Sequence, residues 1–557
     1  AILTVAAIVG NIIANQYATT INVALNASTY KIIHGENTGD TEYFKKGFAS
    51  DEEREAYEAE LCATVEAEGA ALLKNDNNAL PLASGAKVSL FGHGSVDLMY
   101  GGTGSGSVDT SKAPNFKQAL ESQGISVNET LWNLYSSDSM MSKYSRMTPA
   151  SISDTLEANT QYAVNEAPWS ALSSAESSFA EYGDAAIVVL SRSGGEGADL
   201  PSGENGTNDS WIKGPEGDGN YLALSAEEKE LLQNLKTLKD NGTFKKIIVL
   251  INSSNAIEMD FLNPEICGED YGIDSAMWIG DVGQTGINGV AQLLAGEVTP
   301  SGSLVDSYLY DNMANPAMYN FYTQAYPNAA EYNLLTEGAD VQGMYSVYQE
   351  GIYLDYRYYE TRYEDAVMGT GNAGDYNWSN TVAFPFGYGD SYTTFEYSDL
   401  KADEKGVTLT VTNTGSCAGA EIVQLYVAKQ DAKIFRPAQE LKGFAKVFLA
   451  PGESRTVSIA LDDKAFRYWN VKTDRWEVEG GSYQLRVGAS SADIRLTAEV
   501  SVKGTNAPDP YEGLDLLHYV SGQITYVTDA EFEALLGHPV PEDVVRIDRN
   551  MTLAEMD

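Results

Sequence analysis

Short apolar runs separated by helical periods place the strongest limit on how this chain can fold. Residues 185–191 (AAIVVLS) are apolar almost throughout, a pattern typical of strands covered on both faces. Residues 246–252 and 275–280 are further apolar strand candidates. Strands that alternate with helices of this length form mostly parallel sheets, so residues 51–310 predict an α/β domain.

The helix after Ser225 has the clearest start signal. Ser225 and Glu228 have the spacing of a capping box, in which each side chain accepts a hydrogen bond from the other residue's backbone amide. An apolar stripe follows, formed by Leu231, Leu232, Leu235 and Leu238. Further helices are expected over residues 51–74, 114–123 and 287–295, and a further strand over 87–92.

Residues 393–503 show only strand signals. Residues 407–413 alternate between apolar and polar, Thr414 and Gly415 predict a turn, and residues 421–427 are expected to pair with the first strand. A turn at Pro451 and a strand over 482–487 continue the pattern. Short alternating strands with turns at about ten-residue spacing predict a β-sandwich.

Residues 311–392 are rich in tyrosine. A tyrosine ring combines an apolar face with a hydroxyl, so it suits either a sugar ring or packing between domains, and both interpretations stay open. The tyrosines are Tyr319, Tyr322, Tyr326, Tyr332, Tyr345, Tyr348, Tyr353, Tyr356, Tyr358, Tyr359 and Tyr363.

Residues 1–50 begin with an apolar stretch that ends near residue 14. This stretch is too short to span a bilayer alone and is typical of the remnant of a signal peptide or membrane anchor. A buried N-terminal helix is the alternative. The anchor interpretation predicts an extracellular or cell-surface protein.

The acidic composition limits the possible partners. The formal net charge is −43, which argues against nucleic acid and anionic membranes but is compatible with an uncharged sugar. The three cysteines lie far apart, and the four histidines show no paired metal-ligand spacing. No disulfide framework, metal site or cofactor is therefore predicted.

Glu196 is the leading catalytic candidate. It follows the strand over 185–191 and is flanked by glycines, and ligands of α/β sheets bind beyond the carboxyl ends of strands. The alternatives are a solvated loop glutamate, or a role for Asp199, Glu204 or Glu216 in its place. A second loop, residues 100–109, is rich in glycine and matches no phosphate-binding motif. Its Thr103, Ser105 and Ser107 either present hydroxyls to a sugar or belong to a plain flexible loop.

Several segments together resemble the glycoside hydrolase family 3 β-glucosidases, in family order and over residues 50–500. They are residues 68–82 (EGAALLKNDNNALPL), the GGTGSG loop, 191–199 (SRSGGEGAD), 278–284 with 298–302, 348–359 (YQEGIYLDYRYY), 384–389 (FPFGYG) and 436–444 (RPAQELKGF). The resemblance implies an (α/β)6-sandwich domain over residues 51–392, with the tyrosine-rich insertion 311–392, and a fibronectin type III-like domain over 393–503.

The resemblance also implies which residues take part in catalysis. It assigns the general acid/base to Glu196, although this chain has Ser-Gly-Gly-Glu-Gly where the family usually has Ser-Gly-Glu-Gly. It places Ser105 against the terminal sugar, with Thr103 and Arg192 as further substrate-binding candidates. For Arg192, orientation of the acid/base loop or pairing with a carboxylate is the alternative.

The family nucleophile is an aspartate in a Ser-Asp-Trp context within a (β/α)8 barrel, and this tripeptide is absent from the sequence. Some family members carry the barrel last, so residues 504–557 are expected to be a linker towards a barrel on another segment or chain. The implied activity is that of a retaining, exo-acting β-glycosidase, most simply a β-glucosidase, acting on β-glucosides or oligosaccharides. The alternative is a non-catalytic carbohydrate-binding or scaffold protein, and a homodimer is possible.

Two carboxyl groups about 5–5.5 Å apart perform retaining hydrolysis. Glu196 is expected to be the one that protonates the leaving oxygen and later deprotonates water. Desolvation in a closed pocket is expected to raise its pKa for this task.

Overall fold

The computed structural model describes residues 47–146, 162–196, 221–320, 344–368 and 376–542, with isolated positions in 7–22, 212–219 and 324–328 and Val544. The chain divides into two units, Ala1–Tyr57 and Glu58–Asp557. The apolar start of the first unit lies mostly outside the described residues. Among the residues that are described, no helix has both the length and the apolar character needed to cross a bilayer.

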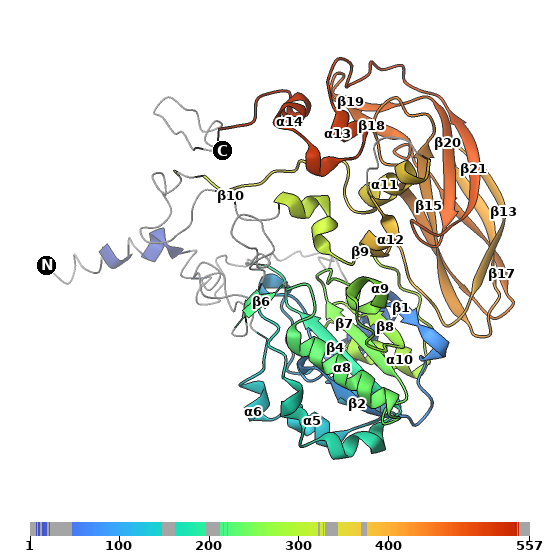
Figure 1. The fold of residues 1–557 in the computed structure, drawn as a ribbon. Coiled ribbons are helices and arrows are strands. Elements are labelled where there is room, and N and C mark those ends of the chain that lie inside the picture. Colours follow the sequence, from blue (N-terminus) through green and yellow to red (C-terminus); the bar gives the residue numbers. More distant parts are fainter. Residues whose placement is uncertain are drawn as a thin grey trace, which may run out of the picture. The chain divides into compact units, whose positions relative to one another are not determined.

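A six-stranded sheet forms the centre of the α/β domain (Figure 1), in the order β1-β8-β7-β4-β2-β3. All neighbours are parallel except β1, which pairs antiparallel with β8 at one edge. The strands are β1 (Ala71–Asn75), β2 (Lys87–Phe91), β3 (Ser126–Val127), β4 (Ala185–Arg192), β7 (Ile247–Ser253) and β8 (Ser275–Trp278). The expected mostly parallel sheet is confirmed.

Helices cover both faces of this sheet. On one face, α4 (Phe116–Ser122) and α10 (Ile287–Ala295) pack in one apolar core with alternate strand residues such as Ile187. On the other, α5 (Glu129–Tyr135) and α8 (Ala226–Asp240) pack with Val188. The predicted capping box at Ser225 is present and starts α8. Two-sided burial explains why the strand sequences are apolar throughout.

The first helix is shorter than predicted. α3 spans Asp51–Gly69, and the residues after it form β1 rather than continuing the helix to position 74. Leu72 of β1 is fully buried. On the side of β1 away from β8, the Asp390 amide donates to the Leu72 carbonyl at 2.8 Å in an isolated antiparallel bridge. Burial of these apolar residues in the sheet stabilises the strand more than their helical periodicity favours a longer helix.

Residues 393–503 form the predicted β-sandwich, with strand order β13-β14-β17 in one sheet and β16-β15-β20-β21 in the other. The strands are β13 (Phe395–Asp403), β14 (Gly406–Asn413), β15 (Gly419–Lys429), β16 (Glu440–Leu449), β17 (Ser454–Ala460), β20 (Gly481–Gly488) and β21 (Ile494–Val502), with a separate hairpin of β18 (Arg467–Asn470) and β19 (Arg475–Val478).

The predicted hairpin of residues 407–413 with 421–427 is wrong. β14 and β15 lie in different sheets, so the turn after Asn413 carries the chain across the sandwich instead of folding it back. The buried Asn413 amide secures this crossing by donating to the carbonyls of Cys417 and Leu449 at 2.9 and 3.0 Å. The alternating pattern identifies a strand but not its partner.

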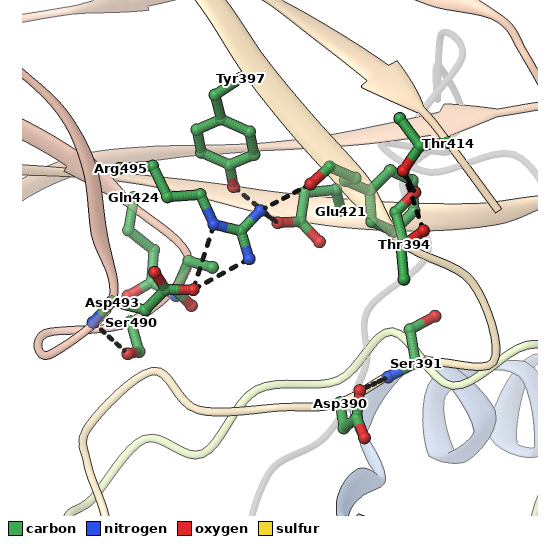
Figure 2. A network of polar contacts seen from close by, with 12 residues as sticks. Asp390, Ser391, Thr394, Tyr397, Thr414, Glu421, Gln424, Ser490, Asp493 and Arg495 are labelled. Atoms are coloured by element: carbon green, nitrogen blue, oxygen red, sulfur yellow. Dashed lines mark hydrogen bonds and ion pairs between the residues drawn. The ribbon is translucent and has the colours of Figure 1, made fainter. Parts of the chain in front are cut away.

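A polar network ties the ends of several sandwich strands together (Figure 2). Arg495 of β21 donates to Glu421 at 3.3 Å and to Asp493 at 2.9 Å, while the Tyr397 hydroxyl donates to Glu421 at 2.6 Å. Gln424 donates to the carbonyl of Ala489 at 2.6 Å. These contacts fix the turn between β20 and β21.

Several tyrosines of the tyrosine-rich segment pack as protein core. Tyr353 and Tyr359 are buried with Tyr519 and Ile524 from the chain beyond residue 504. The Tyr353 hydroxyl donates to the Tyr519 carbonyl at 2.8 Å. For these tyrosines the packing interpretation is confirmed, whereas Tyr322 and Tyr332 lie outside the described residues.

The segment expected to be a linker has structure of its own in its described part. Residues 504–542 contain α13 (Leu517–Val520) and α14 (Asp529–Leu536). They pack in one core with α11 (Tyr356–Met368) and α12 (Trp378–Thr381), and the expected lead into a barrel stays a prediction.

Candidate active site

The candidate site forms where two neighbouring parallel strands end. β2 leads to the glycine-rich loop over residues 101–106, and β4 leads directly to Glu196. Because carboxyl ends of parallel strands share one sheet edge, the two loops meet. Thr103 and Gly195 form a one-residue parallel bridge, and the Thr103 amide donates to the Gly194 carbonyl at 3.0 Å.

Ser105 holds the Glu196 carboxylate. The Ser105 amide donates to Glu196 Oε2 at 2.6 Å, and the Ser105 hydroxyl donates to the same oxygen. The Thr103 hydroxyl donates to the Glu196 carbonyl at 2.8 Å. The structure thus brings together three of the four residues predicted for the site, Glu196, Ser105 and Thr103.

Two glycines at the contact between the loops have a structural reason. Gly195 has a φ of 137°, and a Cβ there would lie 2.4 Å from the Thr103 amide nitrogen. Gly104 on the facing loop has a φ of 70°, and a Cβ there would lie 2.6 Å from Glu196 Oε2. Both positions require the conformational freedom of glycine, so the loops can approach closely enough for Ser105 to reach Glu196.

In this open site the pKa of Glu196 lies below its ordinary value, and the rise expected for a closed pocket stays a prediction. The hydrogen bonds from the Ser105 hydroxyl and amide lower the pKa of Glu196, and the carboxylate is exposed, so burial has little opposing effect. Hydrogen bonds to the charged form of a carboxyl favour that form. In this structure Glu196 is therefore ready to accept a proton rather than to donate one.

Arg192 is not placed to contact a substrate, which corrects the expectation of a sugar contact. Its side chain is fully buried and forms a bidentate ion pair with Glu228 at 2.7 and 2.8 Å. The remaining guanidinium hydrogens reach the carbonyls of Ser191, Tyr221 and Ala223. All five N–H donors of the guanidinium are thus occupied. Arg192 instead anchors the end of β4 to the start of α8.

A second polar cluster contacts Ser191, near the end of β4 and before the loop that carries Glu196. Arg146 donates to the Ser191 hydroxyl at 2.9 Å and pairs with Asp97 at 2.9 Å. His93 lies 3.1 Å from the same Asp97 carboxylate. Burial alone would raise the pKa of Asp97, but the His93 hydrogen bond and the Arg146 charge lower it overall. The cluster keeps an ionised carboxylate below the loop.

A hollow of about 400 Å³ opens beside the two loops. Its lining includes Tyr100, Gly102, Thr103, Ser107, Arg146 and Ser193. Within the described residues, no group of three or more His, Cys, Asp or Glu side chains could hold a metal ion. The alternative carboxylates Asp199, Glu204 and Glu216 lie outside the described residues.

Residues 70–356 match the model of the glycosyl hydrolase family 3 C-terminal domain, which covers more than half of the chain. The chain belongs to glycoside hydrolase family 3. Residues 421–491 of this family 3 chain match the fibronectin type III-like domain, in agreement with the sandwich described above.

The family 3 relatives include two β-glucosidases that align over most of this chain. The thermostable β-glucosidase B of Acetivibrio thermocellus is 30% identical over 455 residues, which cover 80% of this chain and 48% of that protein. The β-glucosidase A of Butyrivibrio fibrisolvens is 31% identical over 478 residues, covering 78% and 50%. The chain spans about half the length of these curated relatives.

A solved family 3 structure shows the same fold. The β-glucosidase 3B from Thermotoga neapolitana in complex with α-D-glucose is 28% identical with a TM-score of 0.60, and the match covers 81% of this chain and 55% of that one.

Sequence reasoning missed the residues that hold the segment before Glu196 in place. The Tyr221 hydroxyl and the Asn255 amide both donate to the Ser193 carbonyl, at 3.0 and 3.1 Å. Asn255 follows β7, the strand next to β4, so its place after a neighbouring strand was an available signal. For Tyr221 the sequence offered no such signal.

Proposed function

We propose that this family 3 chain supplies the general acid/base of a retaining, exo-acting β-glucosidase, with Glu196 in that role. The observation that carries the proposal is the geometry at the strand ends. Glu196 lies at the tip of a double-glycine turn, and Ser105 fixes one carboxylate oxygen by two hydrogen bonds. An exposed carboxylate held in one orientation can meet a glycosidic oxygen.

The proposed cycle needs Glu196 in both protonation states. Its proton passes to the leaving glycosidic oxygen as the bond to the anomeric carbon breaks, and in the second half-reaction the carboxylate takes a proton from the attacking water. The lowered pKa in the open site keeps Glu196 ionised, which is the form that the second task needs. Substrate that covers Glu196 would desolvate it and raise the pKa for the first.

We further propose that the nucleophile comes from a (β/α)8 barrel outside this chain, in the same protein or in a partner. The absence of a Ser-Asp-Trp sequence and the match to only about half of each relative support this division. A β-glucosidase needs both carboxyl groups. This chain alone is therefore expected to be inactive.

An extracellular or cell-surface location is also proposed, supported by the apolar residues 1–14. Fractionation of cells that produce the protein tests it, and activity confined to the cytoplasm would contradict it. Homodimer formation remains a prediction, and sedimentation of the purified protein measures it.

Kinetics on the protein that joins this chain to its barrel tests the catalytic role. Glu196→Ala should lower kcat for aryl β-glucosides by about 10²- to 10⁴-fold. Azide should restore part of the activity, because this anion attacks the anomeric carbon of the glycosyl-enzyme without needing a base and releases the enzyme carboxylate. Glu499→Ala, which removes an exposed glutamate on β21, is the matched control. Unchanged turnover in Glu196→Ala would exclude the role.

Substrate choice is tested in the same assay. Aryl β-xylosides and α-L-arabinopyranosides belong beside the glucoside, because an exo-α-(1→6)-L-arabinopyranosidase of Bifidobacterium breve is 38% identical over 234 residues. A preference for either pentoside would replace glucose in the proposal and leave the role of Glu196 standing.

A further inference from the structure

A second pocket lies between helices α11 and α12 and the sheet that contains β20. It has a volume of about 330 Å³, and none of its lining residues also lines the hollow beside Glu196. Its polar lining comes from Glu360 and Glu364 of α11, Gln439 before β16, Arg486 of β20 and Ser491 in the turn after β20.

Buried side chains form a connected polar wall in this pocket. The Ser491 hydroxyl donates to Glu360 Oε1 at 2.9 Å, and the Gln439 amide donates to the Ser491 carbonyl at 2.7 Å. Arg486 donates to Gln439 Oε1 at 3.0 Å. Glu360, Gln439 and Ser491 are each at least nine-tenths buried. Donors and acceptors thus alternate along one wall.

The backbone that carries Ser491 is fixed in place. The Asp493 amide donates to the Ser490 hydroxyl at 2.9 Å, and Arg495 holds the Asp493 carboxylate (Figure 2). The Ser491 amide donates to the Phe386 carbonyl at 2.9 Å. A wall fixed before a ligand arrives lowers the entropy cost of binding.

Two aromatic rings also line the pocket. Tyr363 and Trp378 lie with ring centroids 5.9 Å apart and planes at 62°. Tyr363 is 45% exposed, although it lies on a helix that packs beside the core. An exposed ring beside fixed polar groups suits a ligand with an apolar face and several hydroxyls.

The charges of the pocket favour an uncharged ligand. Arg486 forms an ion pair with Glu364, which neutralises both. Burial raises the pKa of Glu360 to about 7, against the hydrogen bond from Ser491. Near neutral pH the pocket therefore offers no net positive charge to an anion and only the partial negative charge of Glu360 to a cation.

We propose that this pocket is a second binding site for one pyranose ring, a free hexose such as glucose. The ring's C–H face would pack on Tyr363, and its hydroxyls would exchange hydrogen bonds with Glu360, Gln439 and Arg486. The volume is at the small end for ligand pockets, which suits one sugar ring rather than an oligosaccharide. This site does not depend on the catalytic role of Glu196.

Calorimetric titration of the 557-residue chain with D-glucose tests the site. One saturable site is expected, with a dissociation constant on the order of 1 mM for a ligand of this size. Tyr363→Ala and Glu360→Gln should each weaken binding by about tenfold, through the lost ring contact and the altered hydrogen bonding.

Two further variants separate this site from others. Tyr348→Ala removes a tyrosine that is 73% exposed on the same segment and should leave the affinity unchanged, as should Glu196→Gln. Loss of binding in Glu196→Gln with retention in Tyr363→Ala would place the sugar at the catalytic loop and overturn the proposal. So would no saturable binding, or tighter binding of ethanolamine than of glucose. Unchanged thermal unfolding of each variant shows that the fold is intact.

Discussion

Arg192 and Glu196 differ sharply in their surroundings, although they are only four residues apart. At the strand end, Arg192 is fully buried and every guanidinium hydrogen has a partner. At the tip, Glu196 is exposed and depends on Thr103 and Ser105 from the facing loop. Fold stability and the proposed catalytic chemistry therefore depend on different residues of one short segment, and each can be changed separately.

The largest effect on stability is expected for Arg192, the buried residue of the pair. Arg192→Met leaves Glu228 as an unpaired buried charge, which should lower the free energy of unfolding by about 3–5 kcal/mol. Urea denaturation measures it. Arg192→Met combined with Glu228→Leu should recover much of the loss, because no charge is then left unpaired. Glu196→Gln should change stability by at most about 0.5 kcal/mol, and equal losses at both ends would remove the contrast.

A smaller effect on stability is expected at Gly195, between Arg192 and Glu196. Gly195→Ala places a Cβ against the Thr103 amide at a φ that suits glycine, and should cost about 1–3 kcal/mol. The matched control is Gly106→Ala on the facing loop, where a Cβ meets nothing within 4 Å. Similar unfolding midpoints for the two variants would show that the loops need not touch.

Removal of the clamp on Ser193 should have a similar or smaller effect. Asn255→Ala deletes one of two donors to the Ser193 carbonyl and should cost about 1 kcal/mol. In the joined enzyme it should also lower kcat with little change in KM, since the acid/base loop shifts while the rest of the site stays. A change in KM alone would contradict a positioning role.

The smallest effect is expected on the titration of Glu196. Ser105→Ala removes the hydroxyl bond, so the pKa of Glu196 should rise towards its ordinary value. Because the folded pKa of Glu196 is depressed, the contact between the loops is strongest above the ordinary glutamate pKa and weakens as the pH falls. Carbon-13 NMR of the Glu196 carboxyl measures the titration. An unchanged pKa would show that the amide of Ser105 is sufficient.

Sequence alone predicted the sheet, the sandwich and the place of Glu196 after a strand end, but not its contact with Ser105 of the glycine-rich loop. These features follow from local signals, namely apolar strands and glycines at strand ends. It did not predict that residues 71–75 join the sheet or that Arg192 is buried. Both depend on partners distant in sequence, Trp278 and Glu228. The pKa of Glu196 was missed for the same reason, since it depends on Ser105.

The bridge between Leu72 and Asp390 has a practical consequence for dissecting the chain. An uncovered edge strand offers its free N–H and C=O groups to other molecules and promotes aggregation. β1 is the edge of the sheet, and the segment at Asp390 covers part of its open side. A fragment cut before residue 390 would expose that edge, so soluble expression of the α/β domain is expected to require the chain through at least Asp390.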